Sequence, residues 1–516
     1  MHSYPPLTLG DIIFDNARRF GDIPAYICEG RQLTHAELLD RARRLVSALY
    51  RAGVRRQDRV SILAMNTLEY GEVLAAGQLS GAIIATVNFR LAPPEMLWIL
   101  NDAAPRVLIF EARYREVIDQ LRPQLPSIET YVCIGASADW AIEYEQFLAS
   151  GNAGDAPMQS TQEDIACLIY TSGTTGRPKG CMLGQGEMRA LAHILANEMR
   201  SGCDDRVLLV MPMFHIGAMA VGLGVQFRGG TVVLHRQFDP PAALNALREQ
   251  DITILHLAPT LVQMLLDHAE QAQIEMPNVR TLLYSAAPMP VPLLRRAMAA
   301  MPRAGFLNLY GQTEVVTSGL PREMHKPEGS EREQRWLLSV GHPFPNTQVR
   351  ILDDQGEECP VGVAGEIVVR TAATFRGYWN NTAATLETLR DGWCRTGDIG
   401  RFDEDGLLYL VDRKKDVIIS GGENIYSREV EEALASHPSV AECAVIGLPD
   451  AKWGESVCAI VVTKPGMNVS EDELIGHVRT QIASYKRPRR IEFTQALPKL
   501  PTGKINKVEL RKTYAT

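Results

Sequence analysis

Residues 170–180 read Y-T-S-G-T-T-G-R-P-K-G and combine small, hydroxyl-bearing and cationic side chains directly after an apolar run. Glycine allows the backbone to approach a ligand closely and to turn its N–H groups toward phosphate oxygens. Hydroxyl groups and a lysine ammonium add further donors. A plain surface turn of Gly, Ser and Thr is the alternative, but the density of donors favours a polyphosphate-binding loop. The candidate ligands are Thr171, Ser172, Gly173, Thr174, Thr175, Gly176 and Lys179.

This loop differs from a Walker loop, which places Gly-Lys-Ser/Thr after four residues that follow its first glycine. Here Lys179 follows Arg177 and Pro178. Pro178 removes one N–H donor and restrains the residue before it to extended backbone, so a helix cannot begin as it does in a Walker loop. A phosphate-binding loop of another kind is therefore expected.

Further polar groups stand at the ends of apolar runs, in the order Y-G-Q-T-E at 310–314, T-G-D at 396–398 and P-T-G-K at 501–504. A tyrosine ring can stack on adenine, a carboxylate can bind Mg²⁺, and an aspartate can accept ribose hydroxyls. Each of these residues taken singly has an ordinary interpretation as well: Glu314 as an exposed acid, Asp398 as a turn residue and Lys504 as a surface lysine. Their common occurrence after the glycine-rich loop favours a nucleotide site.

The composition excludes several other classes of protein. At 516 residues the chain exceeds one core and predicts about three structural units. A net charge of −8 argues against nucleic acid as the main partner. Nine cysteines without a C-x-x-C pair indicate neither zinc nor a disulfide framework, which favours the cytoplasm. No signal peptide is expected, because Asp11 and Asp15 interrupt the first apolar periodicity, and no transmembrane segment, because the most apolar stretch, 216–225, is too short.

Apolar strands and amphipathic helices alternate along the first three hundred or so residues. Thr34 and Glu37 form a capping box at the start of one helix, and Gly53 ends it. Strands are expected at 60–64, 81–87, 206–210, 230–234, 252–257, 282–285 and 305–309, with helices at 68–79 and 240–250. Such alternation predicts parallel sheets covered by helices, in which ligands bind beyond the carboxyl ends of the strands.

The pattern changes toward the carboxyl end of the chain. Short strands and turns at 348–370 indicate a β-rich subdomain, at about 340–411. The charged run D-R-K-K-D at 412–416 is interpreted as a hinge between domains, although a solvated face is the alternative. A helix with Ser427 as its N-cap begins a compact α+β region. The prediction is an α/β protein with a large domain at 1–411, containing two mostly parallel helix-covered sheets, and a small α+β domain at 417–516.

From Leu38 to Lys504 the chain resembles the adenylate-forming (ANL) enzymes, which include acyl- and aryl-CoA synthetases, firefly luciferase and the adenylation domains of peptide synthetases. The resemblance implies that ATP and a carboxylic acid form an acyl-AMP and pyrophosphate with Mg²⁺ as cofactor. The thiol of coenzyme A would then give acyl-CoA and AMP. The implied nucleotide ligands beyond the first loop are Ser285, Ala286, Ala287, Pro288, Tyr310, Gly311, Gln312, Asp398 and Arg413.

Catalytic roles also come from the resemblance. It implies that Thr313 contacts the α-phosphate, Glu314 binds Mg²⁺ and Lys504 is the catalytic lysine of a mobile C-terminal domain. Lys415 matches the residue on which that domain pivots between the two half-reactions. Gly421 and Gly422 would line the channel for the pantetheine arm of CoA, where a side chain would obstruct the thiol.

The acid pocket is expected to be small and apolar. His215 matches a position at the mouth of the acyl pocket and is included among the catalytic candidates, although an ordinary loop histidine is the alternative. No aspartate stands at 213–219 to bind an α-amino group, so an amino acid is not expected. A fatty or aromatic acid fits such a wall. The expected wall residues are Ile216, Gly217, Ala218, Ala258, Pro259, Val315 and Val316.

Some positions depart from the family. Gly184 and Gln185 replace a usual Thr-His pair, and Asp412 replaces a frequent glycine. Ser285 and Ala286 replace a frequent Gly-Gly pair, which would disfavour very long chains. Two alternatives to a CoA ligase are an enzyme that loads a carrier protein and a non-catalytic relative that binds adenylate or acyl-CoA; a luciferase-type oxygenase has no support in the sequence. A homodimer is also expected.

Overall fold

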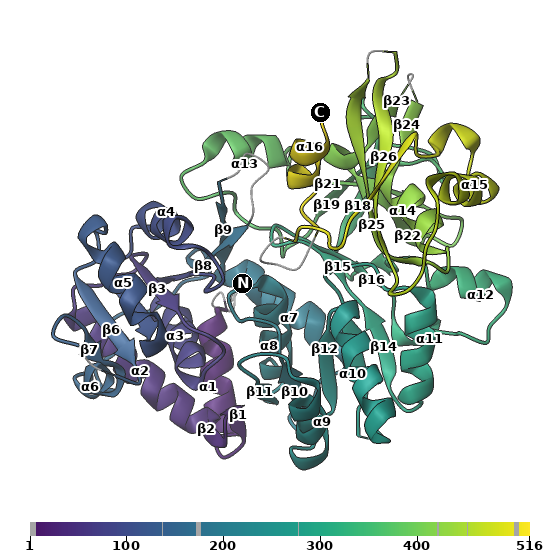
Figure 1. The fold of residues 1–516 in the computed structure, drawn as a ribbon. Helices are drawn as coiled ribbons and strands as arrows, with labels where there is room; N and C mark the ends of the chain where they lie inside the picture. The colour runs from purple at the N-terminus through teal and green to yellow at the C-terminus, as the bar shows by residue number, and fades with distance from the viewer. Residues whose placement is uncertain are drawn as a thin grey trace. The chain divides into compact units, whose positions relative to one another are not determined.

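The computed structural model describes residues 7–136, 138–171, 177–276, 278–420, 423–450, 452–499 and 505–515. Contacts divide the chain into two compact units. The first comprises Met1–Val349 and Val369–Arg395, and the second comprises Arg350–Val368 and Thr396–Thr516. Figure 1 shows the helices and strands of both units, coloured along the chain. The proposed hinge at 412–416 lies within the second unit and stays a prediction.

The first unit contains two large, mostly parallel sheets, which confirms the predicted fold class. One sheet has the order β7-β6-β5-β3-β4-β8-β9, in which β9 runs antiparallel to β8. Its central strands are buried, as expected where helices cover both faces. The strands are β3 (Arg59–Leu63), β4 (Ile83–Thr86), β5 (Val107–Glu111), β6 (Thr130–Ile134), β7 (Ile142–Glu143), β8 (Ile165–Thr171) and β9 (Lys179–Gly184).

The second sheet has the order β14-β13-β12-β10-β11-β1-β2, and its strands run parallel except for β2. Its strands are β1 (Pro24–Cys28), β2 (Arg31–Thr34), β10 (Arg206–Leu209), β11 (Thr231–Leu234), β12 (Ile254–Leu257), β13 (Thr281–Tyr284) and β14 (Gly305–Asn308). The expected strands therefore form within about two residues of their predicted ends. The apolar runs predicted β10 to β14 of this sheet, whereas β1 and β2 were not predicted.

Helices connect and cover the two sheets. Helix α7 contacts β8 and β9 of one sheet, and α8 contacts β10 and β11 of the other, while α7 and α8 pack against each other. The helices of this unit are α1 (Leu9–Arg19), α2 (His35–Arg51), α3 (Leu68–Ser80), α4 (Pro93–Ala103), α5 (Arg115–Leu121), α6 (Tyr144–Ala149), α7 (Gln185–Met199), α8 (Ile216–Gln226), α9 (Pro240–Glu249), α10 (Pro259–Ala272), α11 (Val291–Ala300), α12 (Glu331–Trp336) and α13 (Thr382–Thr388). No helix in the described ranges is long and apolar enough to cross a membrane.

The predicted capping box is present at the start of α2. The backbone N–H of Glu37 donates to Thr34 Oγ1 over 3.2 Å, and the N–H of Thr34 donates to Glu37 Oε2 over 2.8 Å. Gly53 follows the helix with φ of +87°, a left-handed conformation that favours glycine. Both ends of α2 are thus determined by local sequence.

Smaller sheets complete the fold. Strands β15 (Tyr310–Gly311), β16 (Val316–Gly319) and β17 (His342–Pro343) form an antiparallel ribbon. The predicted β-rich region forms a sheet of β18 (Gln348–Leu352), β19 (Gly365–Arg370), β20 (Leu389–Arg390), β21 (Trp393–Phe402) and β22 (Leu408–Arg413). The division between the two units passes through β18, β19 and β21.

The C-terminal part of the second unit is an α+β sheet with the order β24-β23-β26-β25, to which β27 is added beside β26. Buried aliphatic residues on both faces of β25 and β26 form its cores. The strands are β23 (Ile418–Ser420), β24 (Glu423–Ile425), β25 (Val440–Asp450), β26 (Gly454–Thr463) and β27 (Arg490–Phe493). The helices are α14 (Ser427–Ala435), α15 (Glu471–Gln481) and α16 (Lys507–Tyr514).

One local prediction is wrong. Ser427 is the first residue of α14 rather than its N-cap, which is Tyr426. The carboxylate of Asp412 takes the capping role instead: it accepts from the backbone N–H of Ser427 and, over 3.4 Å, from that of Arg428. A distant aspartate thus satisfies donors that the sequence pattern assigned to a local serine.

Candidate functional site

Most of the candidate residues follow neighbouring strands of the second large sheet. Strands β10, β12, β13 and β14 are adjacent and parallel, so the loops that follow them emerge at one carboxyl edge. The structure therefore brings together side chains that are separated by more than one hundred residues in sequence. The candidates at this edge are His215, Ile216 and Gly217 after β10, Ala258 after β12, Ser285, Ala286, Ala287 and Pro288 after β13, and residues 310–316 after β14.

A tight hairpin turn positions Thr313 and Glu314. The backbone N–H of Gln312 donates to the carbonyl oxygen of Val315 over 2.7 Å and closes the turn between β15 and β16. Gly311 is required there, since a Cβ would lie 2.9 Å from the Val315 carbonyl oxygen. Tyr310, at the start of the hairpin, is buried. The turn thus holds the predicted phosphate and metal ligands on short, paired strands.

The two ends of the glycine-rich loop are held together by the pairing of β8 with β9. Thr171 is the register partner of Lys179, and its Oγ1 donates to the Lys179 carbonyl oxygen over 3.5 Å. The candidates Ser172, Gly173, Thr174, Thr175 and Gly176 lie outside the described residues. The antiparallel pair therefore fixes the entry and exit of the loop.

Tyr378, which the sequence did not predict as a site residue, joins these two parts of the proposed site. Its hydroxyl donates to Glu314 Oε1 over 2.7 Å, and Lys179 Nζ lies 5.0 Å from the centre of its ring. The residue follows Gly377 in the connection between β19 and α13. A glycine followed by two aromatic residues was the available signal, but nothing in the sequence linked it to Lys179.

The charge of Glu314 affects the pKa of the neighbouring side chains. Burial, followed by the charge of Glu314, raises the pKa of Tyr378 and of the Cys181 and Cys394 thiols, so all three stay protonated. Within the described residues no group of three or more His, Cys, Asp or Glu side chains is arranged to hold a metal ion. A single oriented carboxylate fits Mg²⁺, which commonly takes one or two protein carboxylates and completes its shell with phosphates and water.

A buried histidine, also missed, lies beneath the loop after β13. His256 is 1% exposed, and its Nε2 lies 2.9 Å from Ser285 Oγ. Burial lowers its pKa to about 4, so the ring is neutral at pH 7. Ala286 has φ of +72°, a conformation in which glycine, frequent at this position in the resembling family, is favoured. A lone histidine in the apolar run 252–257 was the signal that a polar contact lay here.

The candidate acid-binding residues are partly or fully buried. His215 precedes α8, and its ring lies 4.3 Å from that of Phe214 between centroids. Val315 and Val316 are buried. The side-chain amide of Asn66 anchors the preceding loop, since it donates to the carbonyl oxygen of Met211 over 3.1 Å and its Oδ1 accepts from the N–H of Met213 over 2.8 Å. The loop that leads to His215 is therefore anchored at two points that precede the histidine.

The candidate ribose ligands lie together in the second unit. Asp398 and Arg413 are register partners on β21 and β22, and Arg413 Nε lies 2.7 Å from Asp398 Oδ1. Lys415 is exposed in the short turn after β22. The candidates Gly421, Gly422 and Lys504 lie outside the described residues.

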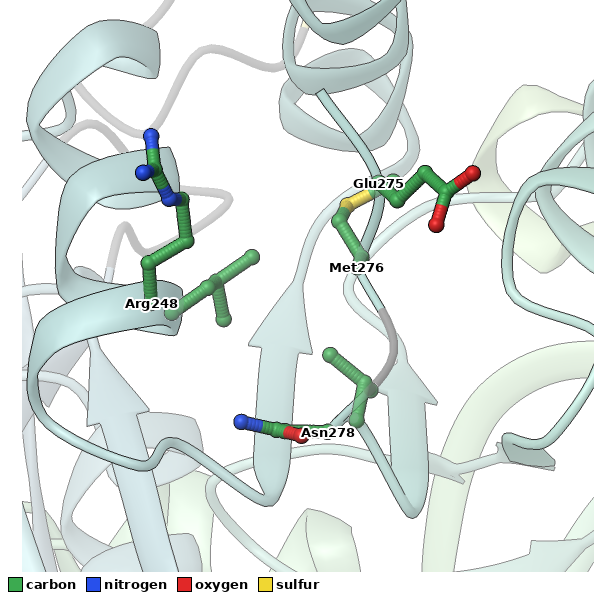
Figure 2. Close-up of a pocket in the computed structure, with 6 residues that line it drawn as sticks. Arg248, Glu275, Met276 and Asn278 are labelled. Atoms are coloured by element: carbon green, nitrogen blue, oxygen red, sulfur yellow. The ribbon is translucent and has the colours of Figure 1, made fainter.

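Two hollows in the described surface of the first unit contain none of these candidates. One, of about 260 Å³, is lined by residues that precede β12 and β13, at the amino edge of the sheet; Figure 2 shows Arg248, Glu275, Met276 and Asn278 around it. The other, of about 660 Å³, lies beyond β1 and β11 and includes Cys28, Arg113 and Arg236. The first is therefore opposite the edge where ligands of parallel sheets bind.

Comparisons with known proteins show the family to which the chain belongs. The model of the family described as AMP-binding enzyme matches residues 13–379, and that of the AMP-binding enzyme C-terminal domain matches 429–504. A feruloyl-CoA synthase of Amycolatopsis sp is 38% identical over 486 residues, which cover 94% of each chain. The fatty acid–[acyl-carrier-protein] ligase ScoC of Streptomyces coeruleorubidus is 36% identical over 95% of this chain and 93% of its own. ATP-bound MatB from Rhodopseudomonas palustris has a similar structure, with a TM-score of 0.87, 28% identity and 99% coverage of both chains.

Proposed function

The chain belongs to the AMP-binding enzymes of the adenylate-forming superfamily, among their acid–CoA ligases, and from this premise we propose that it converts a fatty or aromatic acid to its CoA thioester through an acyl-AMP. The observation that carries the proposal is the chain of contacts from Lys179 through Tyr378 to Glu314. It connects the base of the glycine-rich loop with the turn that carries Thr313.

The first half-reaction joins two anions. The acid carboxylate attacks the α-phosphorus of ATP, the bond to the bridging oxygen of pyrophosphate breaks, and a mixed anhydride forms. Lys179 and the hydroxyls of its loop bind the β- and γ-phosphates, Thr313 donates to the α-phosphate, and Tyr310 stacks on adenine. Lys504 offsets the charge that develops as the carboxylate approaches.

Glu314 would hold Mg²⁺, which supplies charge neutralisation on the phosphates when bound. The hydrogen bond from Tyr378 orients one oxygen of that carboxylate. Asp398 and Arg413 would bind the ribose, and their ion pair holds both side chains ready for its hydroxyls.

The second half-reaction exchanges the nucleotide for a thiol. The sulfur of CoA attacks the acyl carbon, AMP leaves, and the thiol proton is lost. We propose that the C-terminal domain rotates about Lys415 between the two steps, which removes Lys504 and brings Gly421 and Gly422 to the pantetheine arm.

The nature of the acid is inferred from the wall of its pocket. Small and apolar residues around Gly217 and Ala258 suit an aromatic or aliphatic tail, and no acidic residue at 213–219 is present to bind an ammonium group. The similarity to a feruloyl-CoA synthase supports an aromatic acid, and the similarity to a fatty acid ligase supports an aliphatic one.

A second candidate activity is transfer of the acyl group to a carrier protein. It is favoured by the 36% identity with ScoC, a ligase named for an acyl-carrier protein. Both acceptors carry the same thiol on a pantetheine arm, so both would use the same channel.

The test combines two assays on the purified protein. Exchange of labelled pyrophosphate into ATP is measured with acids from acetate to palmitate and with benzoates and cinnamates, and AMP release is then measured with CoA and with holo-carrier protein. We expect exchange with at least one acid and AMP release that depends on CoA. Absence of exchange with the whole panel would favour a non-catalytic binding protein, and turnover with the carrier alone would favour the second activity.

We also propose a cytoplasmic location and a homodimer. The nine cysteines, all within the described ranges, carry free thiols, which supports a reducing compartment. Sedimentation analysis of the purified protein would test the oligomeric state.

A further inference from the structure

His256 carries a buried nitrogen that the chain leaves without a hydrogen bond. The residue lies in β12, and its Nε2 contacts Ser285 Oγ at 2.9 Å. Its Nδ1 is buried and has no hydrogen-bond partner among the described residues. Leaving a buried polar atom unpaired destabilises the folded state, so such atoms are rare in folded proteins and require an explanation. A partner supplied by a ligand is one such explanation.

The surroundings of the ring indicate where that partner would lie. A Cβ added at Gly217 would be 3.5 Å from His256 Cε1, and no other heavy atom would lie within 4 Å outside the neighbouring helix backbone. Cε1 is the atom between the two ring nitrogens, so this edge of the imidazole faces the space beside Gly217. Gly217 belongs to the wall proposed for the acid pocket. Gly217 and the edge of the imidazole are thus neighbours, and the proposed acid pocket would extend to that edge when the tail of the acid is bound.

The protonation of His256 defines the partner. With its pKa lowered to about 4 by burial, the ring is neutral at pH 7 and has one donor and one acceptor nitrogen. Which nitrogen carries the proton depends on whether Ser285 donates or accepts. A hydroxyl group on the ligand can donate or accept a hydrogen bond, so it can pair with Nδ1 whichever nitrogen carries the proton. An alkyl tail has no polar group and cannot pair with Nδ1.

Resting on the proposed function, we propose that His256 determines specificity by binding a hydroxyl group on the tail of the acid. The substrate class is then a hydroxylated aromatic acid. A flat ring fills the space among small apolar wall residues and carries its hydroxyl to a fixed position. A plain fatty acid would keep Nδ1 unpaired.

The test compares matched pairs of acids by kcat/KM for adenylation: 4-hydroxycinnamate with cinnamate, and 4-hydroxybenzoate with benzoate. Octanoate serves as the aliphatic reference. We expect the unmodified enzyme to prefer the hydroxylated member of at least one pair by about 10- to 100-fold, since a buried site that loses its hydrogen-bond partner discriminates strongly. Equal values within both pairs would overturn the proposal.

Two substitutions distinguish the roles of the two ring nitrogens of His256. The amide of Asn branches at Cγ and places a polar atom near Nδ1, whereas the amide of Gln is one bond longer and reaches the position of Nε2. His256→Asn should retain the preference for the hydroxyl, and His256→Gln should reduce it at least tenfold with less effect on the unsubstituted acids. A uniform loss for all acids in both variants would indicate a structural role and would contradict the proposal.

Gly217→Ala tests the same space with little risk to folding. Its Cβ would make one ordinary contact, at 3.5 Å, and alanine is favoured over glycine within α8. We expect a fall of at least tenfold in kcat/KM for the preferred aromatic acid and a smaller change for octanoate. An unchanged order of preference would place the acid elsewhere and overturn the proposal. Absence of adenylation by the unmodified enzyme with every acid would instead refute the proposed function itself.

Discussion

At the scale of single residues, Tyr378 connects the two halves of the proposed phosphate site. It contacts Glu314 through its hydroxyl and Lys179 through its ring, so its two functions can be separated by substitution. A phenylalanine keeps the ring beside the ammonium group and removes the hydrogen bond. The orientation of the Glu314 carboxylate then depends on fewer contacts.

Tyr378→Phe should lower kcat/KM for adenylation by about 10- to 100-fold, because a hydrogen bond to a charged group contributes about 1.5–3 kcal/mol. We also expect a higher Mg²⁺ concentration for half-maximal rate. Pyrophosphate exchange measured across a Mg²⁺ series gives both values. Tyr50→Phe, at an exposed position, is the matched control. An unchanged Mg²⁺ dependence would contradict the role given to the hydroxyl.

His325 makes the stability of the first unit depend on pH. Its Nε2 lies 2.9 Å from the Tyr284 hydroxyl and its Nδ1 lies 3.0 Å from the Pro321 carbonyl oxygen, and burial lowers its pKa to about 4. An unfolded chain binds the proton near pH 6.5, so between these values the unfolded state holds more protons. Stability is therefore complete above about pH 6.5 and falls as the pH drops toward 4.

When the pH falls from 7 to 4.5, the histidine binds a proton more readily in the unfolded chain than in the folded one. The free energy of unfolding should therefore decrease by about 2–3 kcal/mol because of His325. His325→Gln lacks a titrating ring and should show a loss smaller by that amount. Urea unfolding at the two pH values measures the difference, with His193→Gln as an exposed control. The same pH sensitivity in the His325 variant and the parent would refute the assignment.

At the scale of elements, the charged segment 412–416, which begins within the last residues of β22, is held in place by side-chain contacts. Asp412 accepts hydrogen bonds at the start of α14, Lys414 Nζ donates to Glu366 Oε2 over 3.0 Å, and Asp416 forms an ion pair with Arg511 at 2.8 Å. In the described structure Lys415 has no ion-pair partner, whereas the charged residues on either side of it do. The segment is thus anchored on both sides of one exposed lysine, and the proposed pivot at Lys415 stays a prediction.

Asp412→Ala should destabilise the second unit by about 1–2 kcal/mol, because it removes the acceptor for the first N–H groups of α14. Chemical denaturation followed by circular dichroism would measure the change. Asp354→Ala removes an exposed carboxylate nearby and should have little effect. If Asp412→Ala destabilises the protein no more than Asp354→Ala does, the first N–H groups of α14 must have other hydrogen-bond acceptors.

The elements that the sequence predicted are those with a regular pattern. Strand β12 and helix α2 follow from apolar periodicity and a capping box, and the loops after β13 and β14 meet because parallel neighbours end at one edge. Tyr378 and His256 could not be assigned in this way. Their partners, Glu314 and Ser285, are distant in the chain, and such contacts depend on packing that no local pattern encodes.

At the scale of the whole molecule, the proposed rotation of the C-terminal domain separates the two half-reactions. Lys504→Ala should reduce adenylation at least a thousandfold, yet still convert supplied acyl-AMP to acyl-CoA at close to the normal rate. Single-turnover assays of each step make the comparison. Equal loss in both steps would rule out a role confined to adenylation.

Gly421→Leu should have the opposite effect. A side chain in the channel for the pantetheine arm would block thioester formation and leave pyrophosphate exchange near its normal rate. The same two assays measure the outcome. If turnover with CoA survives, Gly421 does not line the channel.

The thiols beside Glu314 have a consequence for the fate of the activated acid. Cys181 and Cys394 are buried, and burial together with the nearby carboxylate keeps their sulfurs in the unreactive neutral form. In the proposed reaction, a thiolate close to the acyl-AMP could attack its acyl carbon and form a thioester with the enzyme. Because these two sulfurs are buried and neutral, we expect them not to capture the intermediate, which leaves it for the incoming acceptor.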